Sequence, residues 1–358
     1  MAIENSLSLH AGPAARAALA DGGLNPARVG ALAGAAGGPK WLVLSALDRY
    51  LFGEWLPRAE QPVDLVGSSI GAWRFAAACH RQDPAGAITA LEAAYLAQQY
   101  SSGADRDEIT AVLRGVLEQF LTDEVADGVL THPRYRLHVV TVRSRLFTRS
   151  ERRGALAAGS GLAALTNIAS RRALGWFFER VVFSRDGRSV QWAGNGHSSR
   201  TVELSATNVR DAVDASGNIP MLMHGVSNPA GAPAGIYRDG GIVDYHIDQP
   251  LLAPGSEAPL VLMPHFDTRI VPGWFDKPLA WRRPRFASNT LMIGPGPGLL
   301  DRLADRRVPD RKDFHRYAGD DAARLAAWRR AIDAGKFMRD AFIELAESDD
   351  PVRHVQAL

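Results

Sequence analysis

Two successive segments near the start of the chain follow one plan, and this plan constrains the fold more than any other feature. The first passes from a small and apolar stretch at 29–33 through a glycine-rich loop at 34–41 into leucines at helical spacing over 44–51. The second passes from an apolar stretch at 63–66 through a glycine-bracketed turn into an alanine-rich helix. Two such strand–loop–helix units in succession predict an α/β fold in which a mostly parallel central sheet is covered by helices.

The remainder of the chain supplies further elements to such a sheet. It contains no internal repeat, no low-complexity tract and no linker, so we expect a single domain over residues 1–358. Its motif core covers 28–250, and a C-terminal strand and helices in 255–350 pack on that core. The further elements that we expect are two helices within 84–129, a strand over Leu137–Val142, a hairpin around Asp186-Gly187, a strand over Leu260–Met263, a helix with Leu325, Trp328 and Ile332 on one face, and another with Met338, Phe342 and Leu345.

The segment 154–178, GALAAGSGLAALTNIASRRALGWFF, admits two interpretations. It is apolar and built mainly from small residues. Because apolar stripes on helices usually face the interior, we interpret it as a core helix. The alternative is a mobile cap over an apolar pocket.

Composition and charge argue against several classes of function. With 46% hydrophobic residues, a chain of 358 residues can bury a large core. Lys and Arg total 41 against 39 Asp and Glu, a net charge of +2 that gives no reason to expect a nucleic-acid partner. The single cysteine, Cys79, leaves no internal disulfide and no cysteine cluster for zinc, and we expect no metal and no cofactor. The N-terminus does not resemble a signal peptide and no apolar run reaches about 18 residues, so we expect a cytoplasmic protein.

A short motif at the second loop carries the strongest chemical signal. In Gly67-Ser68-Ser69-Ile70-Gly71, the two glycines remove side chains that would collide where a strand reverses tightly into a helix. The central residue, Ser69, then lies exposed on the turn, where N–H groups of the following helix stabilise developing negative charge. The motif therefore indicates a nucleophile elbow. The alternative is an ordinary loop of small residues.

The glycine-rich loop GAAGGPKW places unobstructed backbone amides at the end of the other strand. It is not a Walker phosphate loop, because Pro39 separates the glycines from the lysine and Trp41 stands in place of Ser or Thr. The G-x-G-x-x-G pattern of a dinucleotide site is also absent there. We therefore interpret Gly37, Gly38, Pro39 and Lys40 as an oxyanion hole. Lys40 either adds positive charge or is a solvated lysine at a helix start.

A third motif, Asp239-Gly240-Gly241, offers a carboxylate that can approach another loop closely, because no side chain follows it for two residues. Asp244 and Asp248 stand nearby in the sequence. The alternative is a plain Asp-Gly turn.

The three motifs together resemble the patatin-like phospholipase family, whose pattern is a G-G-G-x-[RK]-G loop, a G-x-S-x-G elbow and a D-G-[GA] motif in this order. The segment ASGNIP, with Ala215, Ser216 and Pro220, is similar to the family's A-S-x-x-x-P segment. The resemblance implies a three-layer α/β/α fold. It also implies a lipid acyl hydrolase with a Ser69–Asp239 dyad, an oxyanion hole in the glycine loop and no cofactor.

The resemblance covers residues 34–244 and departs from the family pattern in places. Ala36 and Trp41 stand where relatives have glycine, and Ala72 follows the elbow where many have a further glycine. After the aspartate motif, many relatives have Asn-x-Pro, whereas this chain reads DYHIDQP, with Asp244, His246 and Pro250. These differences bear on the substrate more than on the mechanism.

The residue types themselves support the same chemistry. Ser69 would attack an ester carbonyl while Asp239 takes its proton and later passes it to the leaving alcohol. Amides of Gly37 and Gly38 would hold the oxyanion, at about 3 kcal/mol for each donor. Since an aspartate in solution has a pKa of about 3.9, burial or a short contact must make it a better base.

Three alternatives stay open. A Ser–Asp–His triad of the α/β-hydrolase kind would need a late histidine, and His246, His265, His315 and His354 are available. The same dyad could serve an acyltransferase or a thioesterase. The scaffold could also bind acyl ligands without turnover.

Two basic stretches suggest contact with a lipid surface. WFDKPLAWRRPRF, residues 274–286, interleaves aromatic residues with arginines, and RSRLFTRSERR, residues 143–153, is the second. Such a composition suits an anionic lipid surface, whereas the alternative is arginines that solvate the surface and pair with carboxylates. We expect a lipid or acyl-ester substrate and hypothesise a transient peripheral contact with a membrane.

Overall fold

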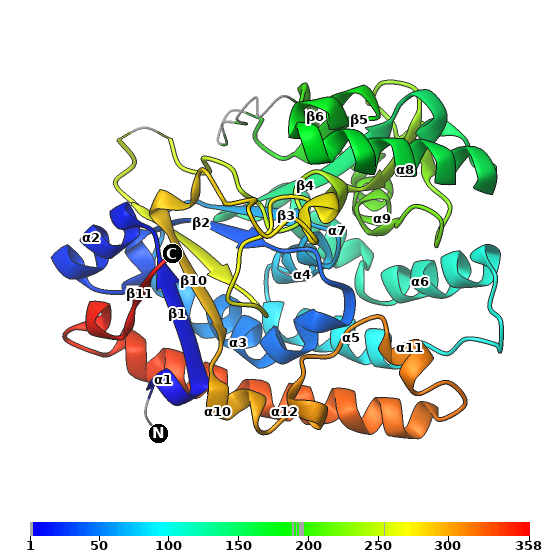
Figure 1. The fold of residues 1–358 in the computed structure, drawn as a ribbon. Helices are drawn as coiled ribbons and strands as arrows, with labels where there is room; N and C mark the ends of the chain where they lie inside the picture. Colours follow the sequence, from blue (N-terminus) through cyan, green and yellow to red (C-terminus); the bar gives the residue numbers. More distant parts are fainter. Residues whose placement is uncertain (1–2, 188–189, 191, 193–196, 254) are drawn as a thin grey trace.

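One mixed sheet runs through the molecule and takes strands from both ends of the chain (Figure 1). The computed structural model describes residues 3–187, 190, 192, 197–253 and 255–358. The strands are β1 (Leu7–Ala11), β2 (Val29–Gly34), β3 (Val63–Ser68), β4 (Tyr135–Ser144), β5 (Phe178–Ser184), β6 (Ser199–Glu203), β7 (Val226–Ser227), β8 (Ile236–Asp239), β9 (Leu260–Pro264), β10 (Thr290–Pro295) and β11 (Gln356–Ala357). Their order is β11-β1-β10-β9-β2-β3-β4-β5-β6, with β8 paired to β4 and β7 to β8.

The centre of the sheet is parallel, as the two opening units predict. β10, β9, β2, β3 and β4 pair side by side in the same direction. Antiparallel pairs join β1 to β10, β5 and β8 to β4, and β7 to β8. The α/β class and the mostly parallel sheet expected from the sequence are therefore confirmed.

Strand β8 meets the end of β3 almost head on. Ser68, the last residue of β3, pairs with Val140 of β4, and Asp239, the last residue of β8, pairs with the next residue, Thr141. The other edge of β4 is taken by β5 over this whole stretch. β8 therefore runs along the edge of β4 that β3 leaves free, in the opposite direction, and ends where β3 ends.

Helices cover one face of the sheet. α4 (Ile70–Ala78) packs on β2, β3 and β4, and α9 (Val209–Gly217) packs on β4 and β8. Outside α4 lie α3 (Ser45–Tyr50), α5 (Pro84–Leu96) and α12 (Asp321–Ala346), as Figure 1 shows. The remaining helices are α1 (Ile3–Ser6), α2 (Pro13–Gly22), α6 (Arg106–Phe120), α7 (Asp123–Thr131), α8 (Arg153–Ala169), α10 (Pro297–Leu300) and α11 (Asp313–Arg316).

The opposite face is covered by α8 and by a long segment that follows β8. Because side chains alternate along a strand, Leu65 belongs to the core on the helical side and Val66 to the core on this other side. There, Ile247, Leu251 and Ile270 pack over the middle of the sheet. α8 and the 3₁₀ helix η6 (Arg171–Trp176) pack nearer to the β4 end. The molecule is thus a three-layer α/β fold.

The helix boundaries differ from the expectation in two places. Residues 84–129 form three helices instead of two, because Thr122 accepts a hydrogen bond from the N–H of Val125 and begins α7 directly after α6. The C-terminal pattern forms one helix, α12, instead of two. Gly335 lies in its middle because a Cβ there would come within 2.4 Å of the Val43 carbonyl oxygen, so this glycine permits close packing and does not end the helix.

The interpretation of 154–178 as a core helix is wrong for one side of it. α8 buries Leu156, Gly159, Ala163 and Asn167, but its other side exposes leucines to solvent, and 66% of Leu165 is exposed. Periodicity alone cannot distinguish a helix that is buried all round from one whose outer side is apolar and uncovered.

The expected hairpin around Asp186-Gly187 lies partly outside the described residues, since 188–189, 191 and 193–196 are not described. Its first arm is β5. The next described strand, β6, pairs with β5 in parallel.

Candidate active site

Ser69 occupies a strained turn between β3 and α4. Its backbone has φ 56° and ψ −130°, a conformation that residues other than glycine rarely adopt. A Cβ at Gly67 would come within 2.6 Å of the Ala72 backbone, and one at Gly71 within 2.1 Å of the Gly34 carbonyl oxygen. Both glycines of the motif are therefore required sterically. Ser68 ends β3 with a buried hydroxyl that has no partner among the described residues, and Ile70 begins α4.

Asp239 is the direct hydrogen-bond partner of Ser69. The Ser69 hydroxyl donates to Oδ2 of Asp239 at 2.8 Å, and the Gly241 N–H donates to Oδ1 at 2.7 Å. The two motifs stand 170 positions apart in the sequence, and the head-on approach of β8 to β3 brings them together. The backbone around the carboxylate is close-packed, because a Cβ at Gly240 would lie 2.2 Å from the Val140 carbonyl oxygen.

The environment of Asp239 makes it a better base than an aspartate in water. Burial raises its pKa to about 6, against the opposing effects of the hydrogen bonds from Ser69 and Gly241 and of the charges on Arg311 and Lys277. A carboxylate with this pKa is ionised at neutral pH and still accepts a proton far more readily than an ordinary aspartate.

Ser216 holds the backbone of the turn. Its hydroxyl accepts a hydrogen bond from the Ser69 N–H at 2.9 Å and donates one to the Val140 carbonyl at 2.7 Å. Ser216 is fully buried in α9, next to Gly217, whose missing Cβ leaves room for the Trp73 ring. The sequence pointed to Ser216 only through the resemblance and gave it no role. The structure makes it a positioning residue for the strained serine.

The glycine-rich loop lies against the aspartate motif. A Cβ on Gly241 would come within 2.8 Å of the Cβ of Ala36, and the Ala36 N–H donates to the Tyr245 carbonyl at 2.8 Å. Gly37 has φ 177° and ψ −3°, and Gly38 has φ 56° and begins the 3₁₀ helix η2 (Gly38–Leu44). The first N–H groups of a helix have no intrahelical acceptor, so the amides of Gly37 and Gly38 suit an anionic oxygen.

Pro39 and Lys40, which the sequence also assigns to the oxyanion hole, have other roles than the two glycines. Pro39 has no N–H and cannot donate, and as the second residue of η2 it has a fixed φ that suits the first turn. The Lys40 ammonium lies 4.8 Å from the centre of the Phe266 ring. Phe266 itself fills the space where a Cβ on Gly37 would lie, 2.6 Å away. Lys40 therefore belongs to the wall of the site.

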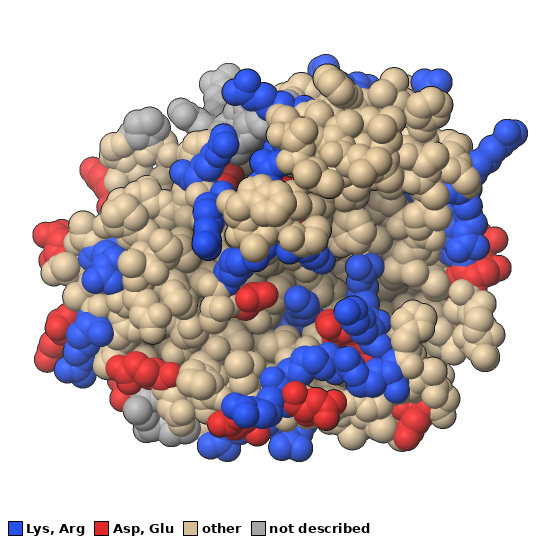
Figure 2. Space-filling model, viewed as in Figure 1, with Lys and Arg blue, Asp and Glu red and all other residues tan. Residues whose placement is uncertain are grey.

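Three cationic side chains surround this site. The Lys277 ammonium lies 3.9 Å from the centre of the Tyr245 ring, and the aliphatic part of Arg311 lies 3.2 Å from a Cβ position at Gly38. Lys40 is the third, and none of the three forms an ion pair within the described part of the chain. Figure 2 shows Lys and Arg side chains gathered across the middle of this face.

The environment also weakens the charge on Lys277. Although the residue is partly exposed, desolvation of its ammonium against Tyr245, together with the nearby charges of Lys40 and Arg311, lowers its pKa to about 7. Desolvation lowers the pKa of Lys40 as well. A bound anion would therefore stabilise the charged form of both ammonium groups.

The triad alternative would need one of four histidines, and two of these, His246 and His265, pack behind the aromatic lining of the site. Nδ1 of His246 accepts from the Val271 N–H, and Nδ1 of His265 accepts from the Phe266 and Asp267 N–H groups. Burial lowers the pKa of His265 to about 3 and that of His246 well below its usual value. His315 is exposed and His354 contacts Glu4. Within the described residues, none of the four is hydrogen-bonded to Ser69 or Asp239.

Several residues of the site carried no signal in the sequence. Tyr245, Phe266 and Arg311 line it but belong to no motif. Lys277 appeared only as one cation in a basic stretch. In the structure, the first three lie against the glycines of the two loops. The sequence offers no pattern that predicts these contacts.

Over the residues that the structure describes, no three His, Cys, Asp or Glu side chains are grouped closely enough to hold a metal ion. The described helices include none with the length and apolar character of a membrane span. A comparison of the chain with models of known protein families finds no match. A comparison with curated proteins also finds no significant relative.

Proposed function

We propose that this protein is a serine acyl hydrolase that cleaves acyl esters of lipids through a Ser69–Asp239 dyad. The observation that carries the proposal is the 2.8 Å hydrogen bond from the Ser69 hydroxyl to Asp239, at a backbone turn with φ 56°. The resemblance of the three motifs to patatin-like phospholipases supports the same assignment.

In the proposed first step, Oγ of Ser69 attacks the ester carbonyl carbon while its proton moves to Oδ2 of Asp239. The tetrahedral oxyanion would lie against the amides of Gly37 and Gly38. Its collapse breaks the bond to the alcohol, which leaves with the proton from Asp239. In the second step, Asp239 takes a proton from water, the water attacks the acyl-enzyme, and the carboxylic acid leaves Ser69, which recovers its proton.

The cations around the site favour a substrate that carries negative charge near the ester. Lys40, Lys277 and Arg311 have no carboxylate partner among the described residues, and an anionic group on the alcohol part of the ester would satisfy them. The lowered pKa of Lys277 supports this, because a bound anion would restore its charge. We therefore expect anionic esters to have a lower KM than neutral esters of equal chain length.

A panel of soluble nitrophenyl esters of increasing acyl length tests the function, with wild type beside Ser69→Ala, Asp239→Asn and the control Ser68→Ala. Ser68 suits as a control because its hydroxyl neighbours the elbow but has no partner among the described residues. We expect both dyad variants to lose turnover by about 10³-fold or more and the control to retain most of it. Retained activity in Asp239→Asn would contradict the dyad.

The products and the substrate preference separate the alternative activities. A hydrolase releases the free acid even when a longer alcohol is present, whereas an acyltransferase forms the new ester. A thioesterase would prefer the thioester of the same acyl chain. A pure binding protein would turn over none of these esters and would leave Ser69 unlabelled by a fluorophosphonate.

A further inference from the structure

The outer side of α8 is uncharged and uncovered from Gly154 to the end of the helix at Ala169. No residue from 154 to 170 is charged, although this side of the helix faces solvent. Exposed apolar side chains continue onto the neighbouring 3₁₀ helix η5 (Leu146–Arg149), η6 and the segment after η8 (Trp274–Asp276). We call the following set the apolar face: Leu146, Phe147, Leu162, Leu165, Ile168, Trp176, Trp274 and Trp281. Apolar faces of this extent on soluble proteins usually mark an interaction site.

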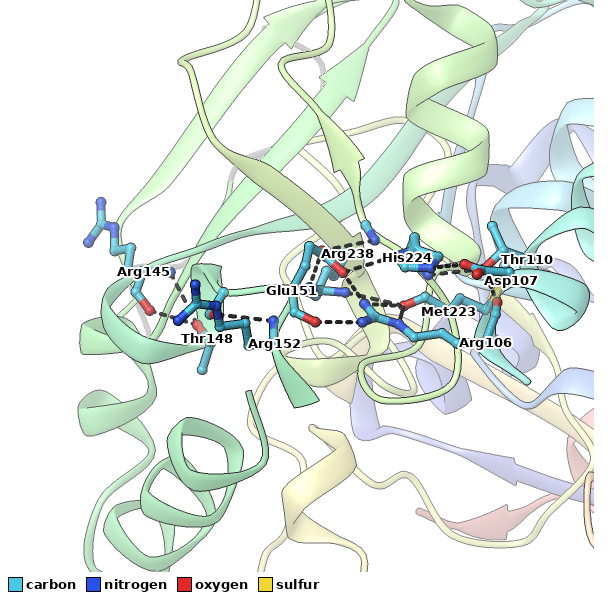
Figure 3. A network of polar contacts seen from close by, with 12 residues as sticks. Arg106, Asp107, Thr110, Arg145, Thr148, Glu151, Arg152, Met223, His224 and Arg238 are labelled. Carbon is cyan, nitrogen blue, oxygen red and sulfur yellow. Dashed lines mark hydrogen bonds and ion pairs between the residues drawn. The ribbon is translucent and has the colours of Figure 1, made fainter. Parts of the chain in front are cut away.

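Internal contacts hold α8 in this position at its first end. Glu151, just before α8, forms ion pairs with Arg238 of β8 and Arg106 of α6 (Figure 3). His224 contacts both Glu151 and Asp107. Arg238 is fully buried and directly precedes Asp239. The start of α8 is therefore tied to the strand that carries the proposed catalytic carboxylate.

Asp276 holds the other end. This fully buried carboxylate contacts Arg171 and Arg282 and accepts a hydrogen bond from the Asn167 side chain at 2.8 Å. Because ion pairs flank both ends of α8, the helix cannot readily turn its leucines inward. The fold keeps this side of α8 exposed.

Basic side chains border the apolar face. Arg152 and Arg153 precede the uncharged stretch of α8, and Arg171 and Arg172 follow it. Figure 2 shows a surface over α8 that is largely free of charge, with basic side chains along its border. An apolar helix with arginines at its rim is typical of segments that lie in the surface of a lipid bilayer.

A cavity of about 560 Å³ opens beside Trp281 at the end of α8. Five arginines line it, together with Asp248: Arg171, Arg172, Arg282, Arg283 and Arg285. Asp276 pairs with two of them, and Asp248 accepts hydrogen bonds from the backbone N–H groups of Arg285 and Phe286. The side chains of Arg172, Arg283 and Arg285 have no ion pair within the described chain, so the cavity has an excess of positive charge that suits phosphate groups.

We propose that the apolar face docks on the surface of an anionic lipid bilayer, with α8 parallel to the membrane and the arginine-lined cavity beside Trp281 holding lipid phosphate groups. Charge complementarity identifies the occupant. A second copy of this chain would place its own arginines against the arginines of the first copy, and these like charges would repel, whereas lipid phosphate groups would attract them. The exposed tryptophans favour the same choice, because indole rings prefer the boundary between headgroups and acyl chains. The docking does not depend on catalysis.

The apolar face also adjoins the candidate active site. The Lys277 ammonium lies 5.7 Å from the Trp274 ring and 3.9 Å from the Tyr245 ring, which borders Gly241. A docked molecule would thus present the site to the bilayer surface. This last step rests on the proposed function, whereas the docking itself does not.

Flotation of the full chain with lipid vesicles tests the proposal. The vesicles consist of phosphatidylcholine alone or of three parts phosphatidylcholine to one part phosphatidylglycerol. We expect wild type to float with the anionic vesicles at least about tenfold more than with the neutral ones. Recovery of wild type in the soluble fraction with both kinds of vesicle would overturn the proposal.

Two variants locate the docking surface, each with a thermal melt to verify folding. Leu162→Asp with Leu165→Asp places charges on the apolar face, and Arg172→Ala with Arg283→Ala removes two of the arginines that line the cavity. We expect each pair to lower anionic-vesicle binding by about tenfold. A matched control, Arg81→Ala with Arg329→Ala, removes two exposed arginines that lie elsewhere and should bind like wild type. Undiminished binding of the Leu162/Leu165 pair, or equal loss in the control, would contradict the assigned surface.

Two further measurements separate this proposal from its rivals. Ser69→Ala should float like wild type, and the Leu162/Leu165 pair should still hydrolyse a soluble ester. Failure of hydrolysis in wild type alone therefore removes the proposed function, and failure of flotation alone removes the docking. Size-exclusion chromatography tests the other occupant: a dimer that the aspartates convert to a monomer, without any flotation, would identify the face as a contact between two copies and refute membrane docking.

Discussion

Two serine–carboxylate arrangements lie at the two ends of strand β3, and they contrast in their backbone setting and in the charge state of their carboxylates. At one end, Ser69 donates directly to Asp239. Near the other end, His138 lies between Asp64, 2.9 Å from its Nε2, and Ser184, 2.8 Å from its Nδ1. By its side chains alone, the second arrangement resembles a hydrolytic triad more closely than the first does.

The backbone distinguishes the two. Ser184, the last residue of β5, faces His138 in the register of β4 and β5, and it also pairs with Glu203 of β6. Burial does not distinguish them: Asp64, His138 and Ser184 are nearly fully buried, but Ser69 and Asp239 are only 6% exposed each, so the expectation of an exposed Ser69 is wrong. Ser69 instead follows its strand, at the carboxyl edge of the parallel sheet, where loops can form a site. Position at this edge, and not the identity of the side chains, makes one serine a candidate nucleophile.

The two carboxylates also differ in charge state. Although burial raises the pKa of Asp64, the opposing effects of His138 and Arg136 are larger and lower it overall, whereas burial dominates at Asp239 and raises its pKa to about 6. Arg136 holds both oxygens of Asp64, at 2.8 and 2.9 Å. One carboxylate is thus locked in an ion pair and the other is able to exchange a proton.

The largest expected effect concerns covalent labelling. A fluorophosphonate should label Ser69 and not Ser184, because only Ser69 lies on a strained turn at a helix start, near the glycine amides of the proposed oxyanion hole. We expect Ser69→Ala to abolish labelling, with a rate loss of about 10³-fold or more, and Ser184→Ala to change the rate by less than about threefold. Peptide mapping by mass spectrometry locates the label, and a label on Ser184 would reverse the comparison.

The next largest effect is on stability at the buried arrangement. Asp64→Asn should lower the free energy of unfolding by about 2–4 kcal/mol at pH 7, because it leaves His138 and Arg136 without their charged partner. Since the pKa of Asp64 is lowered by folding, this stabilisation is present above its usual pKa of 3.8 and is lost as the pH falls through the folded value. Urea unfolding at pH 7 and pH 3 measures the difference, which should shrink at pH 3.

The opposite sign is expected at the dyad. Because folding raises the pKa of Asp239, the wild type loses stability as the pH rises through about 6. Asp239→Asn removes that cost and should raise the free energy of unfolding at pH 8 by on the order of 2 kcal/mol, while abolishing turnover. The pH-dependent part of this gain should vanish below pH 4. A variant that is less stable than wild type at pH 8 would contradict the assigned charge state.

The smallest effect is the shape of the pH profile. We expect kcat/KM to rise about tenfold per pH unit below pH 6, as Asp239 loses its proton. For an anionic ester it should fall again above about pH 7, where Lys277 loses its charge, whereas a neutral ester should show a plateau. Lys277→Met should flatten the alkaline limb for the anionic ester. Identical profiles for both esters would argue against the cations as binding groups.

Much of the fold could be predicted because local patterns and local geometry agree in the first half of the chain. β2 and β3 lie where the apolar stretches before the two glycine loops predict them, since a parallel sheet needs such strands followed by helices. The predicted helix boundaries are wrong where a single side chain determines them, as Thr122 does at the start of α7. The prediction that α8 is a core helix is wrong for its outer side, because burial depends on which elements pack against a helix and not on the helix sequence alone.

The sequence by itself determined which residues could carry the chemistry. Gly67, Ser69 and Gly71 require a tight turn, and Asp239 precedes two glycines that permit close approach, because steric limits on the backbone act locally. Only the tertiary structure decided that these segments meet, since the antiparallel return of β8 along β4 depends on long-range pairing. The same pairing placed Ser216 beneath the turn and left the leucines of α8 at the surface.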